Sequence, residues 1–189
     1  REFLVNLWHE NQGRDLYHVL DALYAIDSEK SDELLLSDSA REKMGDDNSW
    51  YSALARSAKQ NDKSLELVRK ILQSALQVQN KEREYKISFS RLIPLALETK
   101  DEECRQSLLD IVRNSESMGI KRGVIHYLLR SPKSTLQNEE EQNTVINAIR
   151  NDKLIYDDLM KKDYEEMEKG TLGRWLLSPS SPLHKDSRD

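Results

Sequence analysis

Apolar residues recur at intervals of three and four along most of the chain, and this spacing constrains the fold more than any other feature. Clear examples lie in residues 14–27 and 61–79. The spacing places apolar side chains on one face of an α-helix, where they can pack against a neighbouring element. The sequence therefore predicts a chain built from amphipathic helices.

The composition favours helices over sheets. Leucine occurs 27 times, whereas valine occurs 7 times, isoleucine 10 times, glycine 6 times and proline 4 times. Leucine loses less rotamer freedom in a helix than β-branched residues do, and few helix breakers are present. No long stretch alternates apolar and polar residues. We therefore predict the all-α class.

About ten helices are expected, joined by short turns. Residues 2–12 and 14–27 form a pair with Gly13 as the stop between them, and residues 31–44 form a weaker helix that ends near Gly45. Three further helices are expected before residue 97: one over 50–60, one from Asn61 or Asp62 to 79, and one around 89–96. The next helix begins at a Thr99–Glu102 capping box and ends at Met118–Gly119, and another runs from 120 to Ser131–Pro132. The last elements are a helix capped by Asn138 with Glu141, a helix over 152–169 and a final turn that ends at 177.

Short connections favour antiparallel helical hairpins. A weak internal repeat supports a stack of them, because SLELVRKIL at Ser64 resembles SLLDIVRNS at Ser107, 43 residues further on. A period near 40 residues is typical of two-helix solenoids of the HEAT or armadillo type. We therefore expect a solenoid-like stack, with a compact irregular helical bundle as the alternative.

The expected domain organisation is one helical domain over 1–177 and a disordered polar tail over 178–189. The tail is rich in serine and proline and has few apolar residues to bury. Because the chain begins at Arg1, we expect a fragment or a processed chain, so that further functional parts lie elsewhere.

Charge is distributed unevenly along the chain, whose net charge is −5. Residues 1–60 hold 7 basic and 12 acidic groups, residues 61–135 hold 14 and 10, and residues 136–189 hold 8 and 12. The basic residues of the central segment are concentrated in two predicted turns. One turn holds Lys81, Arg83 and Lys86, and the other holds Lys121 and Arg122. Stacked hairpins would place both turns on one edge, which predicts a docking site for a partner with an acidic surface. The alternative is that these cations only solvate turns.

Aromatic residues add two candidates for partner binding. Tyr127 lies near the second basic turn, and Trp175 lies in a short apolar segment before the tail, where it either contacts a partner or caps the last hairpin. Trp8 and Trp50 are expected in the core. The basic bias is too small to favour nucleic acid.

Motifs for catalysis or cofactor binding are absent. The sequence has no glycine-rich phosphate loop, and a single cysteine excludes a cysteine-based zinc site. We predict no cofactor and no metal. Cys104 and His126 are weighed as a thiolate–imidazole pair, but Cys104 lies on an apolar stripe and is expected in the core.

These observations predict a non-enzymatic protein–protein interaction domain, acting as an adaptor, a scaffold element or a host-directed regulator. One alternative is an enzyme or effector with a site dispersed over helices, with candidate groups on His18, Tyr24, His126 and Tyr127. Another is a structural segment of a larger helical scaffold, in which Phe3, Leu4 and Leu7 form an exposed apolar patch. One cysteine and no glycosylation sequon favour an intracellular setting, cytoplasmic or nuclear. No apolar run approaches the roughly 20 residues of a membrane span.

Overall fold

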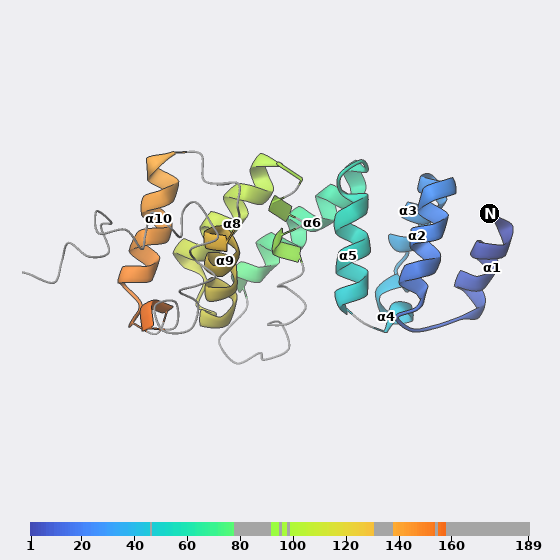
Figure 1. The fold of residues 1–189 in the computed structure, drawn as a ribbon, viewed down its shortest axis with the longest axis horizontal. Helices are drawn as coiled ribbons and strands as arrows, with labels where there is room; N and C mark the ends of the chain where they lie inside the picture. Colours follow the sequence, from blue (N-terminus) through green and yellow to red (C-terminus); the bar gives the residue numbers. More distant parts are fainter. Residues whose placement is uncertain are drawn as a thin grey trace, which may run out of the picture. The chain divides into compact units, whose positions relative to one another are not determined.

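The computed structural model describes residues 1–45, 47–77, 92–94, 96–97, 99–130, 138–153 and 155–157. These residues are mostly helical and include no strand, so the predicted all-α class is confirmed (Figure 1). The chain divides into two compact units, Arg1–Leu72 with Glu84–Cys104 and Gln73–Arg83 with Arg105–Asp189. Among the described helices, none combines the length and the apolar character that crossing a bilayer requires.

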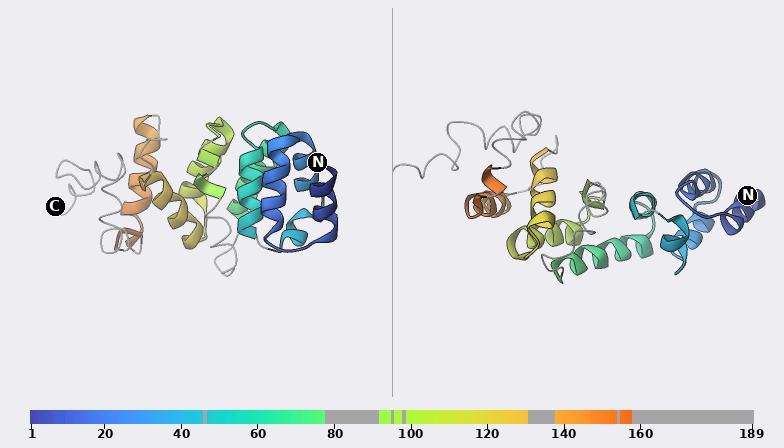
Figure 2. Two further views of the ribbon diagram at one scale, coloured as in Figure 1. Left: turned by 45° about the vertical axis from the view of Figure 1, so that its right-hand side comes forward. Right: turned by 90° about the horizontal axis from the view of Figure 1, so that it is seen from below.

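The first unit begins with a row of packed helices: α1 (Glu2–Glu10), α2 (Leu16–Ile26), α3 (Ser28–Leu35), α4 (Ala40–Met44), α5 (Asp47–Ser57) and most of α6 (Asp62–Ser74). α1 and α2 are antiparallel, because Arg1 Nε at the start of α1 lies 2.8 Å from Asp27 Oδ2 just after α2. α2 also packs on α3 and α5. Figure 2 shows α1, α2 and α5 side by side.

The core of the first unit comes from the predicted apolar stripes. α2 contributes three leucines with almost no exposed surface, and α5 contributes Leu54 and Ala53. Trp8 and Trp50 are 2% and 7% exposed, which confirms that they belong to the core. The large fully buried side chains of this unit include Leu16, Leu20, Leu23, Met44, Leu54, Leu72, Leu92 and Ile93.

A buried polar network joins α3, α5 and α6. Ser57 Oγ donates to Asp32 Oδ1 at 2.6 Å and lies 2.5 Å from Ser64 Oγ. Asn61 Nδ2 donates to the other Asp32 oxygen at 2.7 Å, while Asn61 Oδ1 accepts from the backbone N–H of Ser64 at 3.2 Å. The predicted cap at Asn61 is confirmed, and the same side chain also satisfies a buried carboxylate, which would be costly to leave unpaired.

Two glycines fix the loops around α4. Gly13 and Gly45 have backbone φ values of +101° and +64°, which residues that have a Cβ atom rarely adopt. Gly45 caps the end of α4, as predicted. Gly13 lies after α1 rather than at its immediate end, because α1 stops at Glu10 and Asn11 is its C-cap. The Gly13 N–H instead donates to the Lys43 carbonyl at 2.8 Å, tying the α1–α2 link to α4.

The predicted single helix over 31–44 is wrong, since α3 ends at Leu35 and α4 starts at Ala40. Ser37 Oγ donates to the Leu34 carbonyl at 2.7 Å and so competes with the helical backbone ladder. Serine and aspartate favour such local hydrogen bonds, and residues 37–39 read Ser-Asp-Ser. The chain therefore breaks and turns there.

The second unit contains η1 (Ala75–Gln77), most of α8 (Glu102–Asn114), α9 (Met118–Arg130) and α10 (Glu139–Arg150). Asn138 Oδ1 accepts from the Glu141 N–H at 3.0 Å, which confirms the predicted cap of α10. The buried apolar residues of these helices include Leu108, Val112, Ile125, Leu128, Val145 and Ile149.

Two predicted helix ends near α8 are wrong. The N-cap of α8 is Asp101 and not Thr99, because Asp101 Oδ1 accepts from the Cys104 N–H at 2.8 Å. Thr99 Oγ1 instead donates to the Ala96 carbonyl and closes the preceding turn. Met118–Gly119 begins α9 rather than ending α8, which stops at Asn114. Ser117 precedes α9, and its carbonyl accepts the Lys121 N–H at 2.9 Å.

Candidate functional site

Three of the predicted partner-binding residues lie on α9 and are half-buried: Lys121, Arg122 and Tyr127. At 3.6 residues per turn, Tyr127 points about 120° away from Lys121 around the helix axis. The helix therefore does not gather the three side chains on one face. Lys81, Arg83, Lys86, Trp175 and the tail 178–189 lie outside the described residues.

Lys121 lines an open pocket in the second unit. The pocket has a volume of about 400 Å³ and lies among α8, α9, α10 and the residues just after α10. Its lining residues are Val112, Arg113, Lys121, Thr144, Asn147, Ala148, Asn151 and Asp152. The lining thus combines two cations, two amides, one hydroxyl and one carboxylate with two apolar residues, a composition suited to a polar ligand.

Arg113 is held in place at the pocket wall. Its guanidinium donates to Asp110 Oδ1 and to Thr144 Oγ1, both at 3.2 Å, and lies 3.9 Å from Glu140 Oε1. The Thr144 hydroxyl donates its own proton to the Glu140 carbonyl at 3.0 Å. Arg113 lies in the last turn of α8, where the helix dipole favours a cation. The charge of Arg113 is therefore largely matched within the protein.

Lys121 differs from Arg113 in its partners. Within the part of the chain that the structure describes, its ammonium makes no ion pair or hydrogen bond. It lies in the first turn of α9, at the end of a helix where the dipole disfavours a cation. The amides of Asn147 and Asn151 are exposed and likewise carry no side-chain hydrogen bond in the described ranges. These three groups are available to a ligand.

The carboxylate of Asp152 has a local structural role. Its Oδ1 accepts the Ile155 N–H at 3.1 Å and so caps the short helical segment that follows α10. The described residues that line the pocket include no histidine or cysteine, and the Thr144 hydroxyl contacts Arg113 and a carbonyl rather than a base. A nucleophile needs an adjacent base or a lowered pKa. The Thr144 hydroxyl therefore has no adjacent base among these hydrogen-bond partners.

An ion pair ties α8 to α10. Arg105 pairs with Glu141, and their side chains are only 13% and 8% exposed. The Glu141 backbone N–H is bound by the Asn138 cap, and its Oε1 also accepts from Asn138 Nδ2 at 3.3 Å. The same glutamate thus binds the side chain of the cap residue and holds α8 and α10 together through Arg105.

A second cluster of ionisable groups lies in the first unit. Arg69 donates to Asp101 from Nε at 3.1 Å and from a terminal nitrogen at 2.6 Å. These hydrogen bonds lower the pKa of Asp101 to about 2, against the opposing effect of burial. Burial, followed by the hydrogen bond to Asp101, raises the pKa of the Cys104 thiol to about 12. Cys104 is fully buried and protonated at neutral pH, which confirms its predicted core position.

Tyr24 belongs to an aromatic cluster around Arg56. The Arg56 guanidinium lies 4.8 Å from the Tyr24 ring centroid and 5.6 Å from the Tyr17 centroid, and it pairs with Asp21. The Tyr24 hydroxyl donates to Gln60 Oε1 at 3.0 Å. Burial, with a smaller effect of Asp32, raises the pKa of Tyr24, so this hydroxyl is unsuited to act as a base.

Of the candidate groups for a dispersed enzyme site, none lines the pocket: His18, Tyr24, His126 and Tyr127 are all absent from its wall. His18 packs edge-on against Tyr17, with the ring centroids 5.6 Å apart. The described residues also hold no group of three or more histidine, cysteine, aspartate or glutamate side chains placed to bind a metal ion.

Sequence reasoning identified Lys121 but missed Arg113, Asn147 and Asn151. These residues come from different helices, and the sequence does not show that α8 and α10 lie together. One signal was present: Asn147 and Asn151 are four residues apart and therefore share one helix face. Comparison with known proteins finds no matching family model, no similar curated protein and no similar solved structure.

Proposed function

We propose that the chain is a non-enzymatic protein–protein interaction domain, acting as an adaptor, a scaffold element or a host-directed regulator. The observation that carries the proposal is the pocket beside Lys121, where an ammonium and two amides have no side-chain partner in the described structure. An ammonium and two amides are groups that bind a charged or polar ligand. A site without a nucleophile and base supports a binding role.

The proposed architecture is a solenoid-like stack of antiparallel hairpins, with the compact irregular bundle as the alternative. Its support comes from the first unit, where α1 and α2 form an antiparallel pair and the following helices are joined by short links. Helical stacks of this type offer extended surfaces to partners. The proposal includes an intracellular setting, which the single buried thiol of Cys104 suits.

The proposed partner presents an acidic surface. Lys121 supplies a positive charge that no acidic residue neutralises within the described structure. At contact, attraction between such a cation and an acidic partner helps to set the orientation of the partner. The cations Lys81, Arg83, Lys86 and Arg122, with Tyr127 and Trp175, remain proposed contributors.

A pull-down from cell lysate, with tagged protein at low and at moderate salt, tests this function. We expect a partner that wild type and Lys63→Glu capture alike, and that Lys121→Glu captures much less. Lys63 is a matched control because it is an exposed lysine in the first unit. If Lys121→Glu retains every partner, or if wild type captures none at either salt, the proposed function is wrong.

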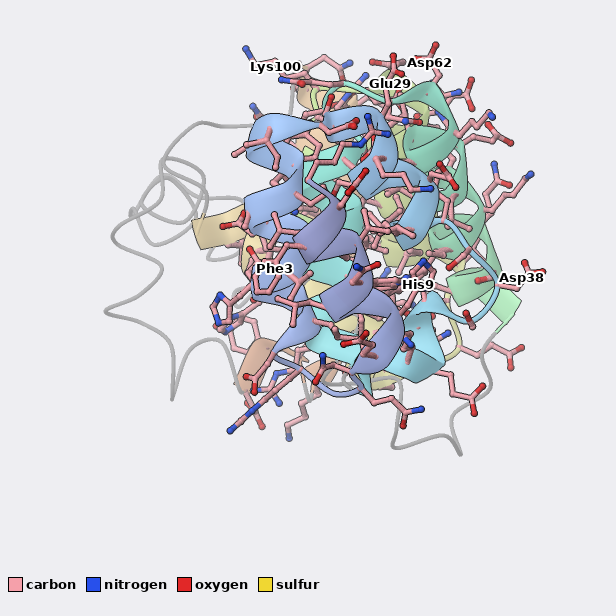
Figure 3. The ribbon with its side chains drawn as sticks, turned by 90° about the vertical axis from the view of Figure 1, so that its right-hand side faces the viewer. Phe3, His9, Glu29, Asp38, Asp62 and Lys100 are labelled. Atoms are coloured by element: carbon pink, nitrogen blue, oxygen red, sulfur yellow. The ribbon has the colours of Figure 1, made fainter. Side chains whose placement is uncertain are left out.

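A structural segment of a larger helical scaffold is a second candidate, and one observation favours it. Phe3 and Ile26 are 71% and 60% exposed, unusually high values for large apolar side chains, and the Arg1–Asp27 pair brings their helix ends together. Figure 3 shows Phe3 at the surface of α1. Leu4 and Leu7 are half-buried, so the expected patch is present only in part.

A further inference from the structure

We propose that the pocket beside Lys121 binds an extended segment of the partner, with Asn147 and Asn151 hydrogen-bonded to its main chain and Lys121 paired with one carboxylate side chain. This inference rests on the proposed function, because it names the part of the partner that the pocket recognises. Beyond that function, it specifies that the partner segment is extended, that its main chain contacts the two asparagines, and that it carries one carboxylate.

The two amides match the chemistry of a peptide main chain. An asparagine side chain has one carbonyl acceptor and two N–H donors, so each amide can bind both the N–H and the C=O of a peptide. Asn147 and Asn151 are exposed on α10, and no described residue occupies their side-chain amides. They are therefore free to pair with an incoming backbone.

The spacing of the amides suits an extended chain. Residues four apart on a helix are separated by about 6 Å along its axis. In an extended strand, residues two apart are separated by about 6.6 Å and face the same way. Asn147 and Asn151 can therefore reach alternate residues of one strand. A helical partner segment does not fit this contact, because its backbone groups are already hydrogen-bonded internally.

The charges of the pocket favour one acidic residue rather than a run of them. Lys121 has no acidic partner in the described structure, whereas Arg113 is bound by Asp110 and Thr144. Lys121 is therefore the group that attracts a carboxylate. Asp152 also lines the pocket, and its negative charge disfavours a second carboxylate there. The same charge disfavours the continuous phosphates of nucleic acid.

The size of the pocket agrees with a short segment. A volume of about 400 Å³ lies at the lower end of the roughly 300–1,000 Å³ that ligand pockets occupy. The buried Val112 and the small, half-buried Ala148 complete the lining. The expected sequence is one Glu or Asp among β-branched residues, which favour the extended conformation.

The test is a nuclear magnetic resonance titration of the full chain with the pentapeptide acetyl-Thr-Val-Glu-Val-Thr-amide. The side-chain NH₂ signals of Asn147 and Asn151 report the main-chain contact. We expect both to shift with one common, millimolar-range dissociation constant. The same peptide with Gln in place of Glu is expected to bind about tenfold more weakly, since a charged hydrogen bond is lost. N-acetylglutamate N-methylamide, which has the carboxylate but no extended chain, is expected not to shift the two amides.

Matched variants separate the two contacts. Asn147→Ala with Asn151→Ala and, separately, Lys121→Gln are each expected to weaken pentapeptide binding by about three- to tenfold. Asn6→Ala with Lys63→Gln replaces the same residue types at exposed positions of the first unit and is expected to bind like wild type. All five positions are exposed or half-buried, and the dispersion of the backbone spectrum checks that each variant folds.

Three results overturn the inference: no shift of the two amides, equal binding of the Glu and Gln peptides, or equal effects of the pentapeptide and the single-residue compound. The proposed function fails differently. If the lysate pull-down yields a partner lost in Lys121→Glu while the pentapeptide leaves the amides unshifted, the interaction domain stands and the extended segment is wrong. If the pentapeptide binds as expected but no partner depends on Lys121, the proposed function is wrong.

Discussion

Asp101 shows how one side chain can serve several structural needs. It caps α8 through the Cys104 N–H and receives two hydrogen bonds from Arg69. The sequence placed the cap at Thr99, two residues early, because the pattern of a polar residue followed by Glu102 fits a capping box. Asp101 is held at the start of α8 by Arg69, which lies 32 residues earlier in the sequence. No local sequence pattern reveals a contact between residues so far apart.

The lowered pKa of Asp101 predicts acid sensitivity. The folded pKa of about 2 lies below the ordinary value of 3.8, so the carboxylate stabilises the fold above about pH 4, and this contribution is lost as the pH falls through 2. Asp101→Asn keeps an oxygen for the cap but removes the charge. We expect it to lower the free energy of unfolding by about 2 kcal/mol at pH 7, as measured by urea denaturation.

The expected signature is the pH dependence of that difference. The gap between wild type and Asp101→Asn should shrink between pH 4 and pH 2, because wild type loses its charge there. Asp38→Asn is the control, since Asp38 is exposed at the surface (Figure 3). A gap that stays constant down to pH 2 would show that the asparagine disturbs the cap rather than the ion pair.

At the scale of the helix, the apolar periodicity of the sequence predicts where helices lie better than it predicts where they begin and end. The apolar stripes of α2, α6 and α10 and the caps at Asn61 and Asn138 follow from local spacing and local hydrogen bonds, so the sequence predicts them. The break between α3 and α4 was missed because the apolar pattern runs through Ser37, whose hydroxyl binds the Leu34 carbonyl. The pocket was missed for a different reason: its wall depends on how α8 pairs with α10.

The Arg105–Glu141 pair predicts how strongly those two helices depend on each other. Arg105→Met leaves the Glu141 carboxylate largely buried without its guanidinium partner, and we expect a loss of about 3 kcal/mol in the free energy of unfolding. Adding Glu141→Leu should recover much of this loss, because two apolar side chains replace the buried pair. Urea denaturation of the single and double variants measures both effects.

The reverse order of stabilities contradicts this account. If the double variant is less stable than Arg105→Met alone, the capping role of Glu141 toward Asn138 outweighs its role as the partner of Arg105. The distance between the Asn138 cap and the ion pair is too short for the two roles to be additive, so the double variant is needed to separate them.

At the scale of the whole molecule, the net charge opposes the contact that we propose. The chain carries −5 overall, although residues 61–135 have an excess of basic groups. At long range the net charge repels an acidic ligand. The attraction of Lys121 for the ligand acts only at contact. The Debye length is about 30 Å at 0.01 M salt and about 10 Å at 0.1 M, so salt screens the two effects at different concentrations.

This separation predicts that the acidic pentapeptide binds most tightly near 0.1 M salt. Below that concentration the net charge repels the peptide, and a Coulomb estimate over about 25 Å gives a weakening of about twofold. Above it, the Lys121–carboxylate attraction is screened and the affinity falls. Titrations of wild type at 0.01, 0.1 and 0.5 M salt (about 30, 10 and 4 Å of screening) measure the curve. In Lys121→Gln, the affinity should still rise between 0.01 and 0.1 M salt, because the net charge still repels the peptide at low salt. The affinity should no longer fall between 0.1 and 0.5 M salt, because the charge that pairs with the carboxylate has been removed. An affinity that falls steadily from the lowest salt in wild type means that the local field of the pocket, and not the net charge, governs the approach of the peptide.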